Sequence, residues 1–342
     1  MSKFNNFQIL EISNGATCLA SGSSLFKDLE AESFKTFFNG LTEDPLNKIR
    51  TNFDKLKDNE LLDYLNENPY MGNRTFMDLL SSAPEDSLAN YPKLLSLKLD
   101  ILNQLNQVNH NYKVFIQEKL NEGLTLAEAQ VESVRHFLNL DKTYSKTKIE
   151  QLYFDEGVSQ EEAERIVSIF ELAGKLIPNK YKKNLPPLNI VVKPSNNQIS
   201  FATSSEDVTV IVLTSKPSII EQLALCLHEY SHLIEKYNPE INLKTNDFMV
   251  SRIRNLNLVP MKSTAEKYRK PYNIIHAHEE VYEGDFIDPY VGKTYGHLGD
   301  ARLVLTEALS VGIEAMMLNP LNFYFRDSEH FYLIYHMLKG DY

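Results

Sequence analysis

Cysteine is scarce in this chain, which contains only Cys18 and Cys226 among its 342 residues. Two cysteines so far apart do not imply a disulfide framework, and their scarcity fits a reducing compartment. Cys226 stands in an apolar segment, so we expect it to be a small residue of the core.

Long apolar runs are also missing. No stretch of 18 apolar residues occurs, so the sequence predicts no membrane span. The first six residues include no basic segment followed by an apolar one, and we therefore expect no Sec-type signal peptide. The predicted location is the cytoplasm, or outside the cell after export as an effector without a cleavable signal.

Positive charge is in deficit. The chain has 35 Lys and Arg against 46 Asp and Glu, a net charge of −11, which argues against a broad basic surface for a nucleic-acid partner. Apolar residues make up 43% and charged residues 24%, values that are typical of a globular protein. The length is enough for one large or two ordinary domains.

The first half of the chain has a helical pattern. Apolar residues recur at three- and four-residue spacing in residues 25–41, 45–65 and 88–120. Residues 122–129 are then echoed by residues 156–163, and each copy has a Gly followed by a Thr or Ser with Glu three positions later. These signals predict two helix–turn–helix joints. We therefore predict a helical bundle over residues 1–180, whose role the sequence does not indicate.

The composition changes near residues 180–187, which are rich in Lys and Pro. Three β-like runs follow at residues 188–192, 198–203 and 208–213, and an apolar helical segment comes directly after them. We therefore predict an α+β fold that is mainly helical, in which residues 181–342 form a small sheet with two functional helices. The edge of such a sheet is suited to bind an extended peptide by strand addition.

The most informative segment is residues 228–232, which read His-Glu-Tyr-Ser-His. Positions i and i+4 of a helix lie on one face, so His228 and His232 can direct imidazole nitrogens at one metal ion. Glu229 follows the first histidine by about 100° of helical rotation, which places its carboxylate beside the metal. A zinc hydrolase needs two neutral nitrogen ligands and a neighbouring base in this arrangement.

The context of this segment favours a buried helix over a chance pattern with two solvent-facing histidines. Residues 219–227 are almost all apolar, and an unpaired buried polar group costs roughly 1–3 kcal/mol. A metal ion would satisfy both histidines and the glutamate. Ser218 and Glu221 form a capping box that begins the helix, and Asn238-Pro239 ends it.

A catalytic zinc takes three protein ligands and leaves one position for water. We predict Glu307 as the third ligand, because it stands among apolar residues of a segment, 303–317, whose pattern predicts a buried helix. A buried glutamate needs a compensating charge, and a metal supplies one. Glu314 is the alternative ligand, on nearly the same face, and is also suited to orient a ligand histidine.

A segment rich in Tyr, Gly and Asp, residues 281–296, lies between the two helices. A Tyr hydroxyl near the zinc can donate a hydrogen bond to the oxyanion that forms during attack on a peptide bond. We predict Tyr295 for this role and Tyr290 as the alternative, while either ring could instead pack the loop onto the core. His297, in the Gly-rich turn beside Tyr295, is a further candidate.

With these residues in view, the chain from about residue 186 to its end resembles zincin metallopeptidases of the Glu-ligand type (gluzincins). Residues 286–295, Phe-Ile-Asp-Pro-Tyr-Val-Gly-Lys-Thr-Tyr, and residues 306–310, Thr-Glu-Ala-Leu-Ser, also resemble metallopeptidase-like domains of phage minor head proteins and bacterial toxins. The resemblance implies peptide-bond hydrolysis, with a base at Glu229 and zinc ligands at His228, His232 and Glu307.

The sequence therefore predicts a zinc-dependent endopeptidase with one Zn²⁺ per chain and a protein or peptide substrate, as in a bacterial toxin or effector, and leaves the oligomeric state open. The alternative is a protein without catalytic activity, in which a closed zinc site with four protein ligands supports assembly or interaction, as in a phage head. A metallohydrolase acting on a bond other than a peptide bond is a third reading of the motif.

Overall fold

The computed structural model describes residues 88–140, 143–194, 200–204, 209–216, 218–268, 277–284, 286–298 and 304–342. The fold is α+β and mainly helical, as predicted. The α-helices are α7 (Pro92–Asn121), α8 (Leu126–Phe137), α9 (Gln160–Ala173), α10 (Asn179–Lys182), α11 (Ile219–Tyr237), α12 (Pro239–Arg252), α13 (Met261–Tyr268), α14 (Ala308–Leu318), α15 (Pro320–Arg326) and α16 (Ser328–Lys339). The strands are β1 (Ile149–Phe154), β2 (Leu188–Lys193), β3 (Phe201–Ser204), β4 (Thr209–Thr214), β5 (Ile253–Pro260) and β6 (Glu280–Gly284), and the 3₁₀ helices are η3 (Gly174–Leu176) and η5 (Pro289–Gly292).

Helix α7 confirms the prediction for residues 88–120. The predicted helices at residues 25–41 and 45–65 lie outside the described residues, so the N-terminal bundle stays a prediction. The chain divides into two compact units, and the one that matters for function consists of Lys119–Arg135, Leu140–Pro320 and His330–Tyr342. This unit begins well before the domain boundary that we predict at residue 180.

The sheet explains why the unit begins upstream. Its strand order is β1-β2-β4-β3, in which β1, β2 and β4 are parallel and β3 is antiparallel to β4. Strands β2, β3 and β4 confirm the three predicted runs, whereas β1 is an edge strand with four exposed residues and little alternation, which is why its sequence does not mark it as a strand. Because β1 pairs with β2, the sheet joins residues on both sides of the predicted boundary.

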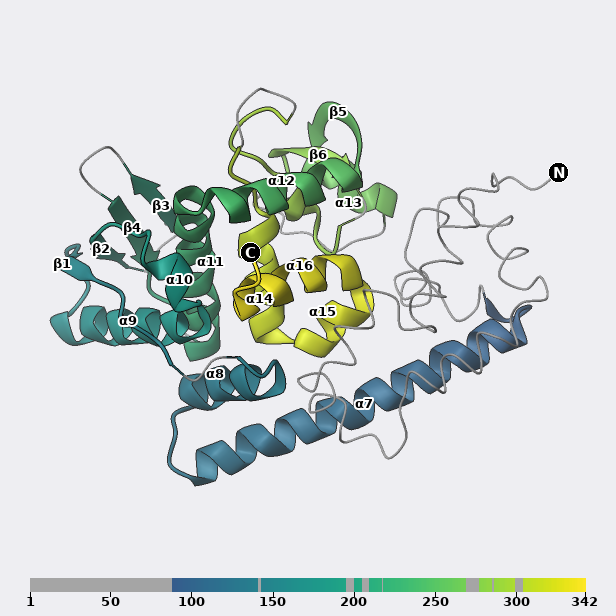
Figure 1. Cartoon of the computed structure of the whole chain (residues 1–342), viewed down its shortest axis with the longest axis horizontal. Helices are drawn as coiled ribbons and strands as arrows, with labels where there is room; N and C mark the ends of the chain where they lie inside the picture. Colours follow the sequence, from purple (N-terminus) through teal and green to yellow (C-terminus); the bar gives the residue numbers. More distant parts are fainter. Residues whose placement is uncertain are drawn as a thin grey trace. The chain divides into compact units, whose positions relative to one another are not determined.

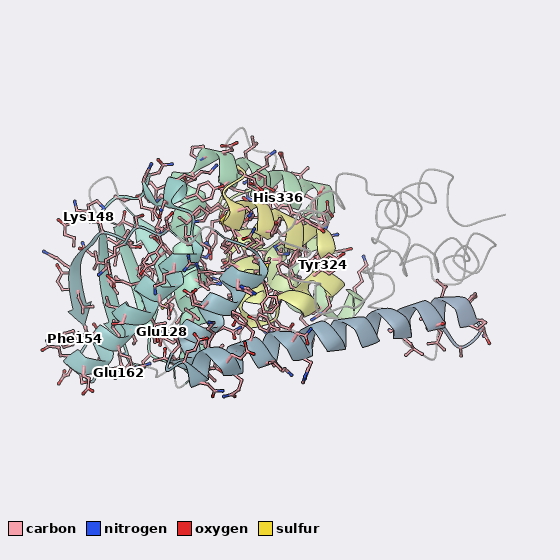
Figure 2. The ribbon with its side chains drawn as sticks, turned by 60° about the horizontal axis from the view of Figure 1, so that its bottom comes forward. Glu128, Lys148, Phe154, Glu162, Tyr324 and His336 are labelled. Atoms are coloured by element: carbon pink, nitrogen blue, oxygen red, sulfur yellow. The ribbon has the colours of Figure 1, made fainter. Side chains whose placement is uncertain are left out.

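Two helices pack on this sheet and on each other. Helix α9 contacts β1 and β2, while α11 contacts β3, β4 and α9 (Figure 1). The opposite side of α11 packs along α14. Phe154 lies at the outer rim of the sheet and is 44% exposed (Figure 2). Helix α11 is therefore the central element of the unit, held between the sheet with α9 on one side and α14 on the other.

Of the two copies of the internal repeat, one folds as predicted and the other does not. In both copies the Gly has a positive φ, 95° at Gly123 and 97° at Gly157, and the following Thr125 or Ser159 caps a helix. The first copy joins α7 to α8, as predicted, but the second follows β1, so the prediction of a helix–turn–helix joint there is wrong. A Gly with positive φ and a Thr or Ser N-cap specify the turn and the helix that follows it. They do not determine whether a helix or a strand precedes the turn.

A second, two-stranded sheet was not predicted. Strands β5 and β6 pair in antiparallel fashion between α12 and η5. They are joined through α13 and precede the segment that carries the two candidate tyrosines. Among the described residues, no helix combines the length and the apolar character that crossing a membrane requires.

Candidate metal centre

The helix that carries the His-Glu-Tyr-Ser-His segment forms as predicted. Ser218 is its N-cap and accepts a hydrogen bond from the backbone N–H of Glu221, and Asn238 follows its last residue. The helix is largely buried, and Cys226 is a core residue whose thiol pKa is raised by burial to about 12. Glu229 and His232 are buried in the unit, as the apolar context predicts, whereas His228 is only partly buried.

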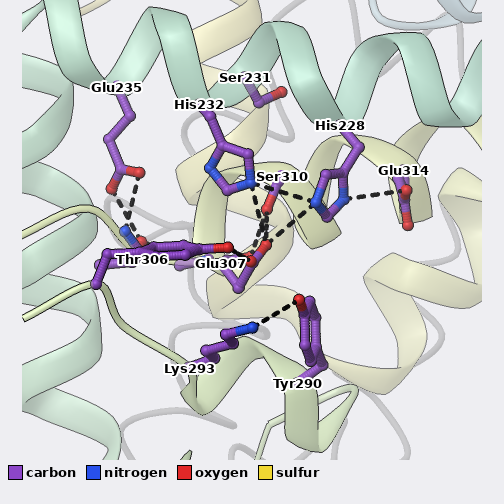
Figure 3. Close-up of polar contacts among 12 residues, drawn as sticks. His228, Ser231, His232, Glu235, Tyr290, Lys293, Thr306, Glu307, Ser310 and Glu314 are labelled. Atoms are coloured by element: carbon purple, nitrogen blue, oxygen red, sulfur yellow. Dashed lines mark hydrogen bonds and ion pairs between the residues drawn. The ribbon is translucent and has the colours of Figure 1, made fainter. Parts of the chain in front are cut away.

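Three of the predicted residues converge on one point (Figure 3). The Nε2 atoms of His228 and His232 are 3.2 Å apart, and the Oε2 atom of Glu307 lies 3.3 Å from the first and 3.5 Å from the second. With zinc–ligand bonds of about 2.0–2.2 Å, two ligands of a tetrahedral site are separated by about 3.3–3.6 Å. The three separations thus match the edges of a zinc tetrahedron.

Glu307 reaches this point from a different place in the secondary structure than predicted. Helix α14 begins at Ala308, so Glu307 is its N-cap residue and not a mid-helix residue. The preceding Thr306 forms an isolated antiparallel bridge with Thr294. The backbone around Thr306 therefore pairs with residues 293–295: the carbonyl of Leu305 accepts the N–H of Tyr295, and the N–H of Glu307 donates to the carbonyl of Lys293. Only the carbonyl of Glu307 joins the helix, where it accepts the N–H of Val311.

The carboxylate of Glu307 is fully buried and held at both oxygens. Ser310 donates to Oε2 at 2.5 Å, and the hydroxyl of Tyr295 donates to Oε1 at 2.6 Å. Burial alone would raise the pKa of Glu307, but the neighbouring imidazoles and these two hydrogen bonds hold the pKa below its usual value. The carboxylate is consequently ionised and fixed in orientation, as a metal ligand must be.

Glu314 takes the orienting role that was its alternative in the sequence. Its Oε1 atom lies 3.1 Å from Nδ1 of His228, which leaves Nε2 of the same ring free to bind a metal (Figure 3). Burial disfavours the charged imidazole, yet the hydrogen bond and the charges of Glu314 and Glu307 outweigh it and raise the pKa of His228 to about 9. Burial lowers the pKa of His232 to about 4, so that ring is neutral.

Replacing Glu314 with alanine is expected to weaken zinc binding by about 10- to 100-fold, the range typical for loss of a group that orients a metal-bound histidine. Chelator competition measures the affinity. Glu240→Ala, at an exposed position of α12, is the control and should leave the affinity unchanged. Equal affinities for the two variants would show that Glu314 does not orient His228.

Glu229 lies beside the three candidate ligands, as the helical spacing predicts. It is only 3% exposed, and burial raises its pKa to about 7. The backbone N–H of Ala202 in β3 donates a hydrogen bond to this carboxylate, whereas its Oε2 atom has no hydrogen-bond partner among the described residues. A buried oxygen of this kind needs a partner, and a water molecule next to the metal site would supply one.

The tyrosines also lie at the site. Burial and the charge of Glu307 raise the pKa values of Tyr295 and Tyr290, so both hydroxyls stay protonated. Lys293 donates to the Tyr290 hydroxyl at 3.2 Å, and its ammonium group lies 5.0 Å from the Tyr290 ring centre and 5.5 Å from that of Tyr295. His297 is exposed, and the group of side chains that can hold a metal does not include it.

Sequence reasoning missed two polar residues at this centre, Ser310 and Lys293. Ser310 follows Glu307 by three positions, the spacing at which a hydroxyl in the first turn of a helix can reach the N-cap side chain. Lys293 stands between Tyr290 and Tyr295 in sequence, but only the bridge between Thr294 and Thr306 brings it to the site.

The residues fit a zinc ion in donor type and in spacing, since two imidazole nitrogens and one carboxylate oxygen are the ligands of many catalytic zinc sites. Comparisons of the chain with models of protein families, with curated proteins and with solved structures gave no match.

Proposed function

We propose that this chain is a zinc-dependent endopeptidase that cleaves a protein or peptide substrate. The observation that carries the proposal is the group formed by His228, His232 and Glu307, whose ligand atoms have tetrahedral separations, with the Glu229 carboxylate beside it. The resemblance of the motifs to gluzincins supports the same function. A role as a bacterial toxin or effector belongs to this proposal and rests on that resemblance alone.

When bound, zinc supplies Lewis acidity, which polarises the scissile carbonyl and acidifies a water molecule. Glu229 accepts the proton of the attacking water and returns it to the leaving amine. Tyr295 is 55% exposed, so its side chain has room to turn its hydroxyl from Glu307 toward the oxyanion that develops on the substrate.

A structural zinc site is the competing function. Structural sites are closed by four protein ligands, whereas catalytic sites have three and leave a position for water. Among the described residues, the metal-binding group contains three side chains, and next to it lies Glu229, whose buried Oε2 atom accepts no hydrogen bond from them. These two observations favour the catalytic alternative.

The test combines metal analysis with digestion of a peptide library derived from whole-cell protein. We expect one zinc per chain and a defined set of cleaved bonds that disappears when the zinc is removed by chelation and returns when it is added back. One zinc per chain without any cleavage would favour the structural alternative. A chain that retains no zinc would overturn the proposal.

Tyr295→Phe is expected to lower kcat for peptide cleavage by about 10²- to 10³-fold, since it removes one hydrogen bond that is stronger in the transition state than in the ground state. Zinc affinity should fall much less, because the phenylalanine ring still covers the site. The measurement is kcat and KM on one peptide from the library. Tyr290→Phe is the matched control and should cleave nearly like wild type; a loss in Tyr290→Phe with little loss in Tyr295→Phe would assign the oxyanion to Tyr290.

A further inference from the structure

One fully buried carboxylate of the unit has no part in the chemistry above. Glu235 lies on α11, three residues beyond His232, and has no exposed surface. Its Oε2 atom accepts the backbone N–H of Thr306 at 3.0 Å, and its Oε1 atom accepts the Thr306 hydroxyl at 2.9 Å (Figure 3). The hydroxyl of Thr245 on α12 also donates to Oε1.

The residue that Glu235 binds is the one next to the third ligand. Thr306 precedes Glu307 and forms the bridge with Thr294. On either side of that bridge, the N–H of Glu307 donates to the carbonyl of Lys293 at 3.1 Å, and the N–H of Tyr295 donates to the carbonyl of Leu305 at 2.8 Å. The two short extended segments that carry Glu307 and Tyr295 are thus bonded to each other, and Glu235 ties them to α11.

We propose that Glu235 is a positioning residue, which sets the distance between the third metal ligand, Glu307, and the two histidines of α11. Because the Tyr295 segment is bonded to the Glu307 segment, Glu235 also positions Tyr295. The inference rests on the proposed metal site. His228 and His232 lie on the same helix as Glu235, so one rigid element carries both ligands and the anchor for the third. Glu307 has no helical turn before it, and its N–H is held only by the neighbouring segment at Lys293. The bonds from Thr306 to Glu235 fix both segments to the helix that carries the two histidines.

A purely structural role explains these contacts less well. A buried carboxylate is costly, and apolar residues of similar volume often replace buried charged groups without loss of stability. Two of the three hydrogen bonds to Glu235 come from Thr306, beside the metal ligand, where an apolar side chain would leave a buried N–H unpaired. The carboxylate is therefore suited to fix this one segment.

The test measures zinc affinity by chelator competition, together with the unfolding midpoint of the metal-free chain. Glu235→Ala is expected to weaken zinc binding by about 10- to 100-fold. Glu235→Gln should restore the affinity to within a few-fold of wild type, because the amide oxygen accepts the Thr306 N–H and the amide NH₂ donates to the threonine hydroxyls. Thr245→Val, which removes one donor to Glu235 on the side away from the metal, should weaken binding by about 5-fold.

Gln222→Ala provides the matched control. Gln222 is fully buried on the same helix and accepts the backbone N–H of Lys216, so its loss also unpairs a backbone group but far from the metal. We expect Gln222→Ala to lower the unfolding midpoint as much as Glu235→Ala does, without a change in zinc affinity.

The possible results are distinct. Wild-type affinity in Glu235→Ala, or equal losses of affinity in Glu235→Ala and Gln222→Ala, would overturn the positioning role while leaving the peptidase proposal intact. If Glu235→Ala does not fold, Thr245→Val and Glu235→Gln decide the question, and unchanged affinity in Thr245→Val counts against the role. A wild type that binds no zinc would overturn the metal site and this inference with it.

Discussion

Glu229→Gln is expected to lower the rate of peptide cleavage by about 10²- to 10⁴-fold, the usual contribution of a general acid–base group, while the chain keeps its zinc. Glutamine has nearly the same shape as glutamate but cannot take up a proton from water. The substitution removes a buried charge that burial already disfavours, as the raised pKa of about 7 for Glu229 shows, so the fold should tolerate it.

Cleavage-site mapping of wild type against Glu229→Gln measures the effect across many peptide bonds at once. The matched control is Glu221→Gln, on the first turn of the same helix, where the glutamate backbone N–H is capped by Ser218 and the side chain is exposed. That variant should cleave like wild type. Wild-type cleavage by Glu229→Gln would remove Glu229 from the mechanism, and loss of its zinc would show that the glutamate acts on the metal site instead.

The parts of this centre that the sequence predicts are those encoded over short distances. A capping box, an apolar helix and two histidines four residues apart all belong to one stretch of α11, and the structure has them as predicted. The convergence of Glu307 on the two histidines was also predictable, because a glutamate in an apolar segment requires a partner. Its place at the start of α14 was not, since the bridge between Thr294 and Thr306 depends on two segments that no local pattern relates.

The same reasoning explains the other differences. Strand β1 is a strand because it pairs with β2, and its own residues are mostly exposed, so its sequence lacks the alternation that would predict a strand. Glu235 looks like an ordinary polar residue near the end of an amphipathic helix until α12 and the Thr306 segment pack over it. In each case the missing information is a contact between residues distant in sequence, which helical periodicity and capping do not report.

The electrostatics of the centre argue for a cation. Burial, with a smaller contribution from the ionised Glu307, raises the pKa of both Glu229 and Glu235 to about 7, and the charge of His228 offsets only part of this rise at Glu229. Buried charges of one sign repel each other strongly when solvent does not screen them. A divalent ion bound to Glu307 would relieve that repulsion, which makes metal binding and the stability of this region interdependent.

Glu307→Gln is therefore expected to lower zinc affinity by about 10²- to 10³-fold, since the binding free energies of about 10–16 kcal/mol of structural zinc sites, shared among their four ligands, give roughly 2.5–4 kcal/mol for each. The amide keeps the length of the side chain and an oxygen for Ser310, but it loses the charge that attracts the ion. Peptide cleavage should fall at least as far at limiting zinc. Chelator competition gives the affinity, and the visible spectrum of the Co²⁺-substituted chain reports whether a tetrahedral site still forms.

Glu283→Gln is the control for the loss of one negative charge, because Glu283 pairs with Lys267 on the β6 side of the unit and contacts none of the three ligands. We expect it to bind zinc like wild type. The decisive comparison is between Glu307→Gln and Glu314→Gln. If the third ligand is Glu307, the first variant loses the tetrahedral Co²⁺ spectrum and the second keeps it with a reduced affinity. The reverse result would assign the third ligand to Glu314 and would require α14 to shift along α11 when the metal binds.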